Sequence, residues 1–151
     1  MLREHQLYAK LSKCSFYQNR IHYLGHIISE EGIEVDPKMI EAIKGWTTPN
    51  NVTEVRSFMG LVGYYRRFIA GYSRIAHLIT SLQRKGVKFQ WTTKCEKSFQ
   101  QLKRLLTSAP ILRIAYPNED FVVCTYACKE GLGGFLSHNG FVICFESIKV
   151  K

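Results

Sequence analysis

Apolar residues change their spacing along the chain, from a helical repeat in the middle to short runs typical of strands near the ends. After Pro110 these runs are β-branched and aromatic, at 121–125, 131–136 and 141–145. We therefore expect an α+β fold with a mainly helical middle. The middle apolar positions recur three and four residues apart, which is one face of an α-helix: Val55, Phe58, Met59, Val62, Tyr65 and Ile69.

Capping residues divide the middle into four predicted helices. Asp36-Pro37 is a typical helix start, with Asp36 as the N-cap and Pro37 at the first helical position, and Gly45 ends this helix. The same kinds of signal bound the other three helices. The second runs from Asn51 or Thr53 to Gly71, the third carries Ile75 to Leu82 and ends at Lys85-Gly86, and the fourth runs from Thr92 or Thr93 to Pro110.

The two ends have different expected structures. Residues 2–11 place three leucines on one side and predict the end of a helix. Residues 16–28 predict a β-hairpin that turns at Gln18-Asn19-Arg20. Near the C-terminus, Asn139-Gly140 between two apolar runs is a strong hairpin signal. We expect a three-stranded fragment of a larger sheet there.

Positive charge is concentrated in the helical middle. The formal net charge is +9, and the stretch from Val55 to Cys95 contains no acidic residue. A long basic stretch suggests a polyanionic partner, because Lys and Arg neutralise phosphates. The alternative is a solvated surface that is basic without a partner. The charges are Arg56, Arg66, Arg67, Arg74, Arg84, Lys85, Lys88 and Lys94.

Cysteine spacing and hydropathy bear on the compartment. The five cysteines are an odd number without framework spacing, which favours reduced thiols. Cys124 and Cys128 with His138 hint at zinc, but their spacing is not that of a common ligand pair, so ordinary thiols are favoured. No long apolar run or secretory signal is present, so we expect no membrane partner and an intracellular chain, in cytoplasm or nucleus.

Short motifs follow one another in order along the chain. They are Leu24-Gly25-His26, Glu31-Gly32-Ile33, Asp36-Pro37, Arg56-Ser57-Phe58-Met59-Gly60-Leu61, Gly63-Tyr64-Tyr65-Arg66-Arg67-Phe68-Ile69, Phe89-Gln90-Trp91, Phe99-x-x-Leu102-Lys103 and Ala109-Pro110-Ile111-Leu112. This ordered series resembles the reverse transcriptase of gypsy-type LTR retrotransposons. The resemblance implies a palm C-terminal remnant at 1–36, a thumb and connection-like helical region at 37–107, and a truncated ribonuclease H-like domain at 108–151.

The resemblance implies two groups of binding residues. Tyr23, Leu24, Gly25 and His26 match the hairpin that positions the primer end in such enzymes. Basic and aromatic residues of the helical region would hold the duplex backbone, since arginines contact phosphates and aromatic rings lie on sugars or bases. Tyr65 and Phe68 are instead expected to point into the core. The candidate nucleic-acid contacts are Arg56, Tyr64, Arg66, Arg67, Arg74 and Lys85.

The chemistry of the family needs carboxylates that this sequence lacks. Template copying uses magnesium ions held by a Tyr-x-Asp-Asp motif, which does not occur here. The family's ribonuclease H strand ends in Thr-Asp-Ala-Ser, whereas this chain has Tyr126 at the aspartate position. A phenol, whose pKa is near 10, does not replace a carboxylate. We therefore expect no catalytic residue, metal or cofactor in this chain, although the intact family enzyme uses magnesium.

Three functional readings remain open. The first is a nucleic-acid-binding remnant of a family whose activities are RNA-directed DNA polymerisation and RNA–DNA hybrid hydrolysis, inactive as this isolated chain. Its partners would be an RNA–DNA or DNA duplex and the missing polymerase domains. The second is a non-catalytic helical DNA-binding domain, and the third is a relic without function. The ordered motifs argue against the second, and a cooperative thermal transition of the purified protein would separate the first from the third.

Overall fold

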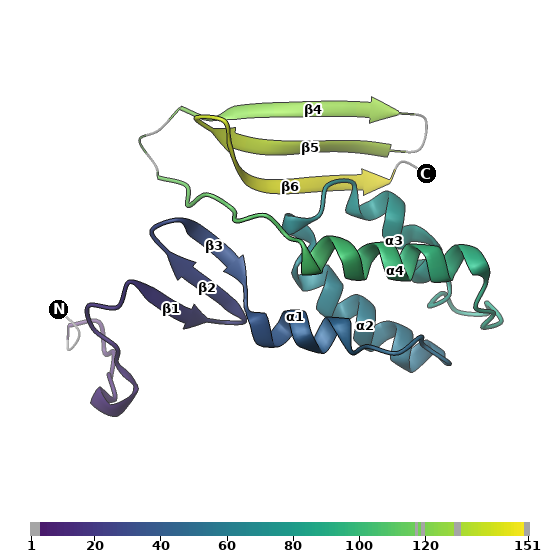
Figure 1. Ribbon diagram of the computed structural model, residues 1–151, viewed down its shortest axis with the longest axis horizontal. Coiled ribbons are helices and arrows are strands. Elements are labelled where there is room, and N and C mark those ends of the chain that lie inside the picture. Colours follow the sequence, from purple (N-terminus) through teal and green to yellow (C-terminus); the bar gives the residue numbers. More distant parts are fainter. Residues whose placement is uncertain (1–3, 117, 119, 129–130, 150–151) are drawn as a thin grey trace.

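The described residues form a group of helices and two small antiparallel sheets, one beside α1 and one beside α3, which confirms the predicted α+β class (Figure 1). The structure is a computed structural model that describes residues 4–116, 118, 120–128 and 131–149. The strands are β1 (Arg20–Tyr23), β2 (His26–Ser29), β3 (Gly32–Val35), β4 (Val122–Cys128), β5 (Gly131–His138) and β6 (Phe141–Lys149). The helices are α1 (Pro37–Lys44), α2 (Val52–Tyr64), α3 (Tyr72–Ser81) and α4 (Thr93–Thr107), with single 3-10 turns η1 (Leu11–Lys13) and η2 (Arg66–Phe68).

Side-chain caps begin three of the helices where the sequence predicts. The Asp36 carboxylate accepts the Lys38 backbone N–H before α1. Asn51 caps α2 and Thr92 caps α4 in the same way. Each cap satisfies a backbone donor that the first helical turn leaves without a partner. The cap residues therefore set the starts of α1, α2 and α4.

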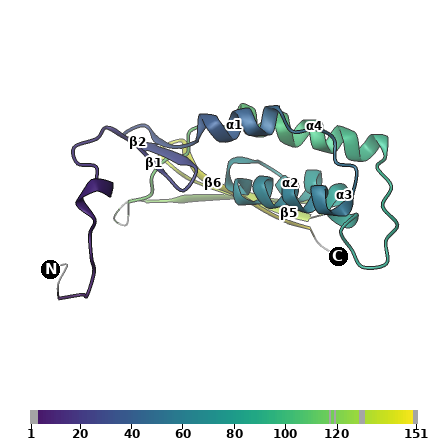
Figure 2. The ribbon, with the colours of Figure 1, turned by 90° about the horizontal axis from the view of Figure 1, so that it is seen from below.

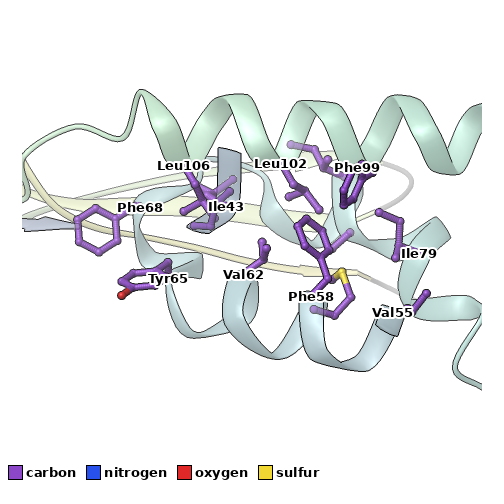
Figure 3. Packing of buried hydrophobic residues seen from close by; sticks show 14 of the residues in the cluster. Ile43, Val55, Phe58, Val62, Tyr65, Phe68, Ile79, Phe99, Leu102 and Leu106 are labelled. Atoms are coloured by element: carbon purple, nitrogen blue, oxygen red, sulfur yellow. The ribbon is translucent and has the colours of Figure 1, made fainter. Parts of the chain in front are cut away.

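The core lies between two layers of helices. α1 and α4 form one layer, and α2 and α3 form the other (Figure 2). Side chains from all four helices meet between the layers, where the Phe58 and Phe99 ring centroids are 4.6 Å apart (Figure 3). The fully buried members include Ile43, Val55, Phe58, Val62, Ile79, Phe99, Leu102 and Leu106.

Two helices end earlier than their apolar spacing predicts. α2 ends at Tyr64 instead of continuing to Gly71, and η2 follows it. The tighter turn allows Tyr65, Phe68 and Ile69 all to be buried. α3 ends at Ser81, and the chain continues to Gly86 as turns. At the end of α2, burial therefore overrides the helical repeat.

The predicted N-terminal helix is wrong over the residues that the structure describes. Residues 4–6 form a turn, 7–10 are irregular, and only the 3-10 turn η1 follows. The Leu7 and Leu11 side chains are exposed. A short helix is stable only when its apolar side packs against something, and no such surface covers these residues in the described part of the chain.

The N-terminal sheet contains the predicted hairpin with a different turn. β1 pairs with β2 so that Tyr23 lies opposite His26, which places the turn at Leu24-Gly25 and not at 18–20. Both turn residues have positive φ, 48° for Leu24 and 76° for Gly25. Such a two-residue turn matches the twist of the paired strands, so it fixes their register.

A third strand, β3, joins this sheet to the distant segment after α4. Ile33 and Leu112 exchange backbone hydrogen bonds of 2.8 and 3.0 Å. Gly32 allows the approach, because a Cβ on it would lie 2.2 Å from the Leu112 carbonyl oxygen. Leu112 and Val35 join the buried core. The N-terminal sheet and the helical layer therefore share one core.

The C-terminal sheet has the predicted three strands in the order β4-β5-β6. Asn139 and Gly140 form the predicted turn, with φ of 49° and 79°. β6 is the strand nearest to α3 and η2 (Figure 1). The β4 edge faces away from the helices, so this edge of the sheet is unpaired among the described residues.

Candidate nucleic-acid interface

Two tyrosine hydroxyls attach the hairpin turn to the end of α2. The Tyr64 hydroxyl donates to the Leu24 carbonyl oxygen at 2.7 Å, and the Tyr65 hydroxyl donates to the Gly25 carbonyl oxygen at 2.8 Å. Burial raises the pKa of Tyr65 to about 12, so its hydroxyl keeps its proton. The structure therefore brings the predicted hairpin and Tyr64 together.

The His26 ring fills the space between the hairpin and α2. It stacks on Tyr64 at 5.3 Å and on Phe68 at 5.8 Å, and it meets Tyr65 edge-on at 5.2 Å. Burial, and then the positive charge of Arg67, lower the pKa of His26. The neutral imidazole is thus the favoured form, and its buried Nδ1 has no hydrogen-bond partner among the described residues.

The two adjacent arginines of η2 have different surroundings. The Arg66 guanidinium lies 3.5 Å from the Glu146 carboxylate of β6. Arg67 is exposed, influences the pKa of His26, and belongs to no ion pair within the described residues. Of the two, Arg67 is the cation left available beside the hairpin turn.

The other predicted basic contacts lie apart from this group. Arg74 is exposed on the first turn of α3, which faces β6. Arg56 is exposed in the first half of α2, about 12 Å along the helix from Tyr64 by the usual helical rise. Lys85 lies in the loop after α3, at the end of the helical layer away from the hairpin (Figure 1). Some of the predicted contact residues thus form a cluster at the hairpin end of α2. The others are separate charges elsewhere on the helices and loops.

Residues of β6 occupy two positions where an anion would bind. Besides Glu146 beside Arg66, the Ser147 hydroxyl oxygen accepts the Ser73 backbone N–H at 2.9 Å. α3 follows Gly71, which has no side chain to cap the helix. The lack of a capping side chain at Gly71 was the one sequence signal that another residue would cap α3. This signal did not identify Ser147 as that residue.

Tyr126 lies in β4 with half of its surface exposed, and its ring covers Gly133 of β5. Tyr126 pairs with Gly133, which pairs with Ser147. Directly paired residues project to the same face of a sheet, whereas neighbours along a strand project to opposite faces. Glu146 therefore projects to the face opposite Tyr126, and a carboxylate at position 126 would not share a site with it.

The Asp36 and Glu96 carboxylates are engaged in structural contacts. The Asp36 carboxylate also accepts from His22 Nδ1 at 3.0 Å, and this bond, with the Lys38 N–H, lowers the pKa of Asp36. Glu96 accepts from Trp91 and Gln100. Within the described residues, no three His, Cys, Asp or Glu side chains gather where they could hold a metal. The Cys128 side chain of the zinc hypothesis lies outside the described residues. The expectation that this chain holds no magnesium stays a prediction.

Bilayer insertion has no candidate among the described helices, none of which is both long enough and apolar enough to span a membrane.

Comparison with known proteins identifies the family. Residues 91–151 match the model of the RNase H-like domain found in reverse transcriptase. The retrovirus-related Pol polyprotein from transposon 297 of Drosophila melanogaster is 38% identical over 97% of this chain, which spans only 14% of that polyprotein. An uncharacterized mitochondrial protein of Arabidopsis thaliana is 45% identical over 74% of this chain and 71% of its own length.

Solved structures show the same fold. The foamy viral protease-reverse transcriptase in complex with RNA/DNA hybrid superposes with a TM-score of 0.83 at 21% identity, over 93% of this chain and 20% of that chain. Its complex with dsDNA gives a TM-score of 0.82 at 21% identity, over 93% of this chain and 30% of that one. Together with the domain match at residues 91–151, the Pol polyprotein relatives show that the chain belongs to the reverse transcriptase family of retrotransposon Pol polyproteins.

Proposed function

We propose that this chain is a nucleic-acid-binding part of a reverse transcriptase, which holds a duplex by its backbone and carries out no chemistry by itself. The observation that carries the proposal is the cluster of the hairpin turn, Tyr64 and Arg67 at one end of α2. A guanidinium beside an aromatic ring can pair with a phosphate while the ring lies on a sugar or base. We call Tyr23, Leu24, Tyr64 and Arg67 the hairpin cluster.

The charge distribution supports the same proposal. The acid-free stretch from Val55 to Cys95 covers all of η2 and α3, and α2 from its fourth residue onward. Arg56, Arg67, Arg74 and Lys85 are exposed on it. Lys and Arg that replace the counterions of a duplex give binding that does not depend on sequence and weakens steeply with salt. The two foamy viral structures are complexes of that enzyme with an RNA/DNA hybrid and with dsDNA.

The proposed lack of chemistry rests on the carboxylates. Two-metal phosphoryl transfer needs several carboxylates around ions about 4 Å apart. Asp36 serves as a helix cap, and Tyr126 stands where the family has an aspartate. The polymerase and hybrid-cleaving activities of the family would then require other parts of a longer protein.

We also propose that the N-terminal segment contacts those other parts. The Leu7, Tyr8, Phe16 and Tyr17 side chains are exposed before β1. In the division implied by the resemblance, residues 1–36 belong to the palm, 37–107 to the thumb and connection, and 108–151 to the ribonuclease H-like domain. Apolar residues of the palm segment would be covered by the rest of the polymerase.

Fluorescence anisotropy with a short labelled DNA duplex or RNA–DNA hybrid tests the binding. We expect a dissociation constant of roughly 10⁻⁴ to 10⁻⁶ M at physiological salt, independent of sequence. Arg67→Ala should weaken binding to every sequence alike and reduce the salt slope by about one. Arg66→Ala should have less effect, because Arg66 is already paired with Glu146.

Lys44→Ala is the matched control. Lys44 is an exposed cation on α1 that pairs with Glu41, away from the hairpin cluster. Its removal changes the net charge as Arg67→Ala does. If the two variants bound equally well, or if binding did not respond to salt, the proposal would be wrong.

A further inference from the structure

The edge strand β6 contacts the helical layer on both of its faces. Glu146 and Ser147 are neighbours on this strand, so their side chains project to opposite faces of the sheet. On one face, the Glu146 carboxylate lies 3.5 Å from the Arg66 guanidinium of η2. On the other, the Ser147 hydroxyl oxygen accepts the Ser73 backbone N–H near the start of α3. Both partners of β6 therefore belong to the acid-free basic stretch.

Glu146 supplies a negative charge to a stretch that has none of its own. Of the ion pairs formed among the described residues, the Arg66–Glu146 pair alone includes a cation of this stretch. Burial raises the pKa of Tyr72, the first residue of α3, and the charge of Arg66 opposes this rise, so the guanidinium lies close to the start of α3. A carboxylate beside a guanidinium occupies the position that a phosphate would take.

The Arg66–Glu146 pair has the features of a contact that a phosphate can displace. The Arg66 and Glu146 side chains are 58% and 66% exposed. The contact joins one guanidinium nitrogen to one carboxylate oxygen, whereas Arg holds a phosphate best through two parallel hydrogen bonds. Exposed ion pairs of this kind contribute little to stability. A phosphate of a bound duplex would therefore compete effectively with Glu146.

We infer that the C-terminal sheet masks Arg66, so that Glu146 and a duplex phosphate compete for the same guanidinium. The sheet lowers the affinity of the basic stretch for nucleic acid while β6 is docked. A bound duplex in turn loosens the docking of β6, because coupling between two binding events is reciprocal. Ser147 is a positioning residue that holds β6 at α3. The inference rests on the proposed function and adds to it a regulation of the phosphate contacts.

Glu146→Gln tests the mask and leaves the strand intact. The Glu146 Oε1 atom also accepts the Ser147 backbone N–H at 3.1 Å, and a glutamine oxygen can keep this bond. Loss of the charge frees Arg66, so the affinity for a labelled DNA duplex should rise about two- to fivefold. The salt slope should steepen by about one, because one more phosphate contact forms. The thermal midpoint should change little, since the pair is exposed.

Glu41→Gln is the matched control. Glu41 pairs with Lys44 on α1, so this substitution also removes one carboxylate and frees one cation, but away from the hairpin cluster. The net charge changes by the same amount in both variants. Glu41→Gln should therefore raise the affinity less than Glu146→Gln does.

Arg66→Ala separates the mask from general repulsion between Glu146 and the duplex. In an Arg66→Ala background, Glu146→Gln should give no gain in affinity, because the masked cation is absent. A carboxylate that only repelled the duplex would give the same gain with or without Arg66.

Ser147→Ala tests the positioning role by the sign of its effect on binding. Loss of the Ser73 contact loosens β6, so the affinity for the duplex should rise while the thermal midpoint falls. A purely structural role would lower both. A fall in affinity that parallels the fall in the midpoint would overturn the positioning role of Ser147.

Equal affinities of the Glu146→Gln and Glu41→Gln proteins would overturn the mask, and so would a gain that persists without Arg66. The proposed function is tested separately by Arg67→Ala. If Arg67→Ala weakens binding and Glu146→Gln gives no gain, only the present inference fails. If the parent protein does not bind at low salt, both fail.

Discussion

The Ser147 hydroxyl oxygen of β6 accepts the backbone N–H of Ser73 at 2.9 Å, so a residue of the C-terminal sheet caps α3. Helix caps usually come from the residue just before the helix, which here is Gly71. The contact ties the sheet to the helical layer, together with the exposed ion pair of Arg66 and Glu146. Surface ion pairs of this kind contribute little, so the cap is the stronger of the two links.

Loss of this cap should destabilise the protein. We expect Ser147→Ala to lower the free energy of unfolding by about 1 kcal/mol, the usual effect of removing a side-chain cap. Urea denaturation followed by circular dichroism measures it. Ser57→Ala is the control, because the exposed Ser57 hydroxyl only donates to the Thr53 carbonyl within α2. If the two substitutions lowered the free energy of unfolding equally, the Ser147 hydrogen bond would contribute no more to stability than the exposed Ser57 bond.

Stability should fall in mild acid because of His26. The folded protein lowers the pKa of His26 from its ordinary value of 6.5, mainly through burial. Below that pH the unfolded chain binds a proton that the folded protein does not bind. The stability that the lowered pKa of His26 contributes is therefore complete above pH 6.5. It is lost as the pH falls toward the pKa that His26 has in the folded protein.

The measurement is the urea midpoint between pH 8 and pH 5 for the parent protein and for His26→Phe. Phenylalanine keeps an aromatic ring in the stack and does not titrate, so the variant should show the smaller decrease. Parallel pH profiles for the two proteins would contradict the assignment to His26.

The core between the helical layers should be sensitive to truncation. Leu102 on α4 is fully buried, and Leu102→Ala should cost about 2 to 5 kcal/mol. This loss is a large fraction of the whole stability of a typical domain, about 5 to 15 kcal/mol. Leu78→Ala on the partly exposed side of α3 is the matched control and should cost much less. Similar unfolding midpoints for both variants would exclude the described packing.

Replacement of Tyr126 by the family's aspartate should not produce nuclease activity. The new carboxylate would project from the sheet on the face opposite Glu146, so the two would not share metal ions. The test incubates Tyr126→Asp and the parent protein with a labelled RNA–DNA hybrid and magnesium. Hybrid-specific cleavage by the variant alone would show that a working site exists within this chain.

The capping and turn residues in the sequence predicted those parts of the fold that depend on interactions between residues close together in the chain. Asp36, Asn51 and Thr92 set helix starts, and Asn139-Gly140 set a hairpin turn, because each acts on backbone groups a few residues away. The N-terminal helix and the hairpin turn at 18–20 were wrong. In the first case the apolar side had no surface to pack on, and in the second the register depends on contacts with α2.

The candidate site was predictable in its residue types and not in its arrangement. The Tyr64 to Arg67 run pointed to nucleic acid, but neighbouring residues proved to have different partners. Arg66 turns to β6, whereas Arg67 lies near His26. The sequence offered no sign that Leu24 would adopt a left-handed conformation, because leucine is rare there. Such arrangements depend on residues far apart in the chain.

The paired backbones of Ile33 and Leu112 limit how the chain can be shortened. Removal of residues 1–36 would leave the Leu112 N–H and carbonyl without partners beside the core, and removal of residues 108–151 would do the same to Ile33. A fragment comprising only the helices from Pro37 to Thr107 would therefore expose backbone and apolar surface at two places. We expect such trimmed versions to aggregate during expression, whereas versions that keep both partners of the bridge should remain in solution.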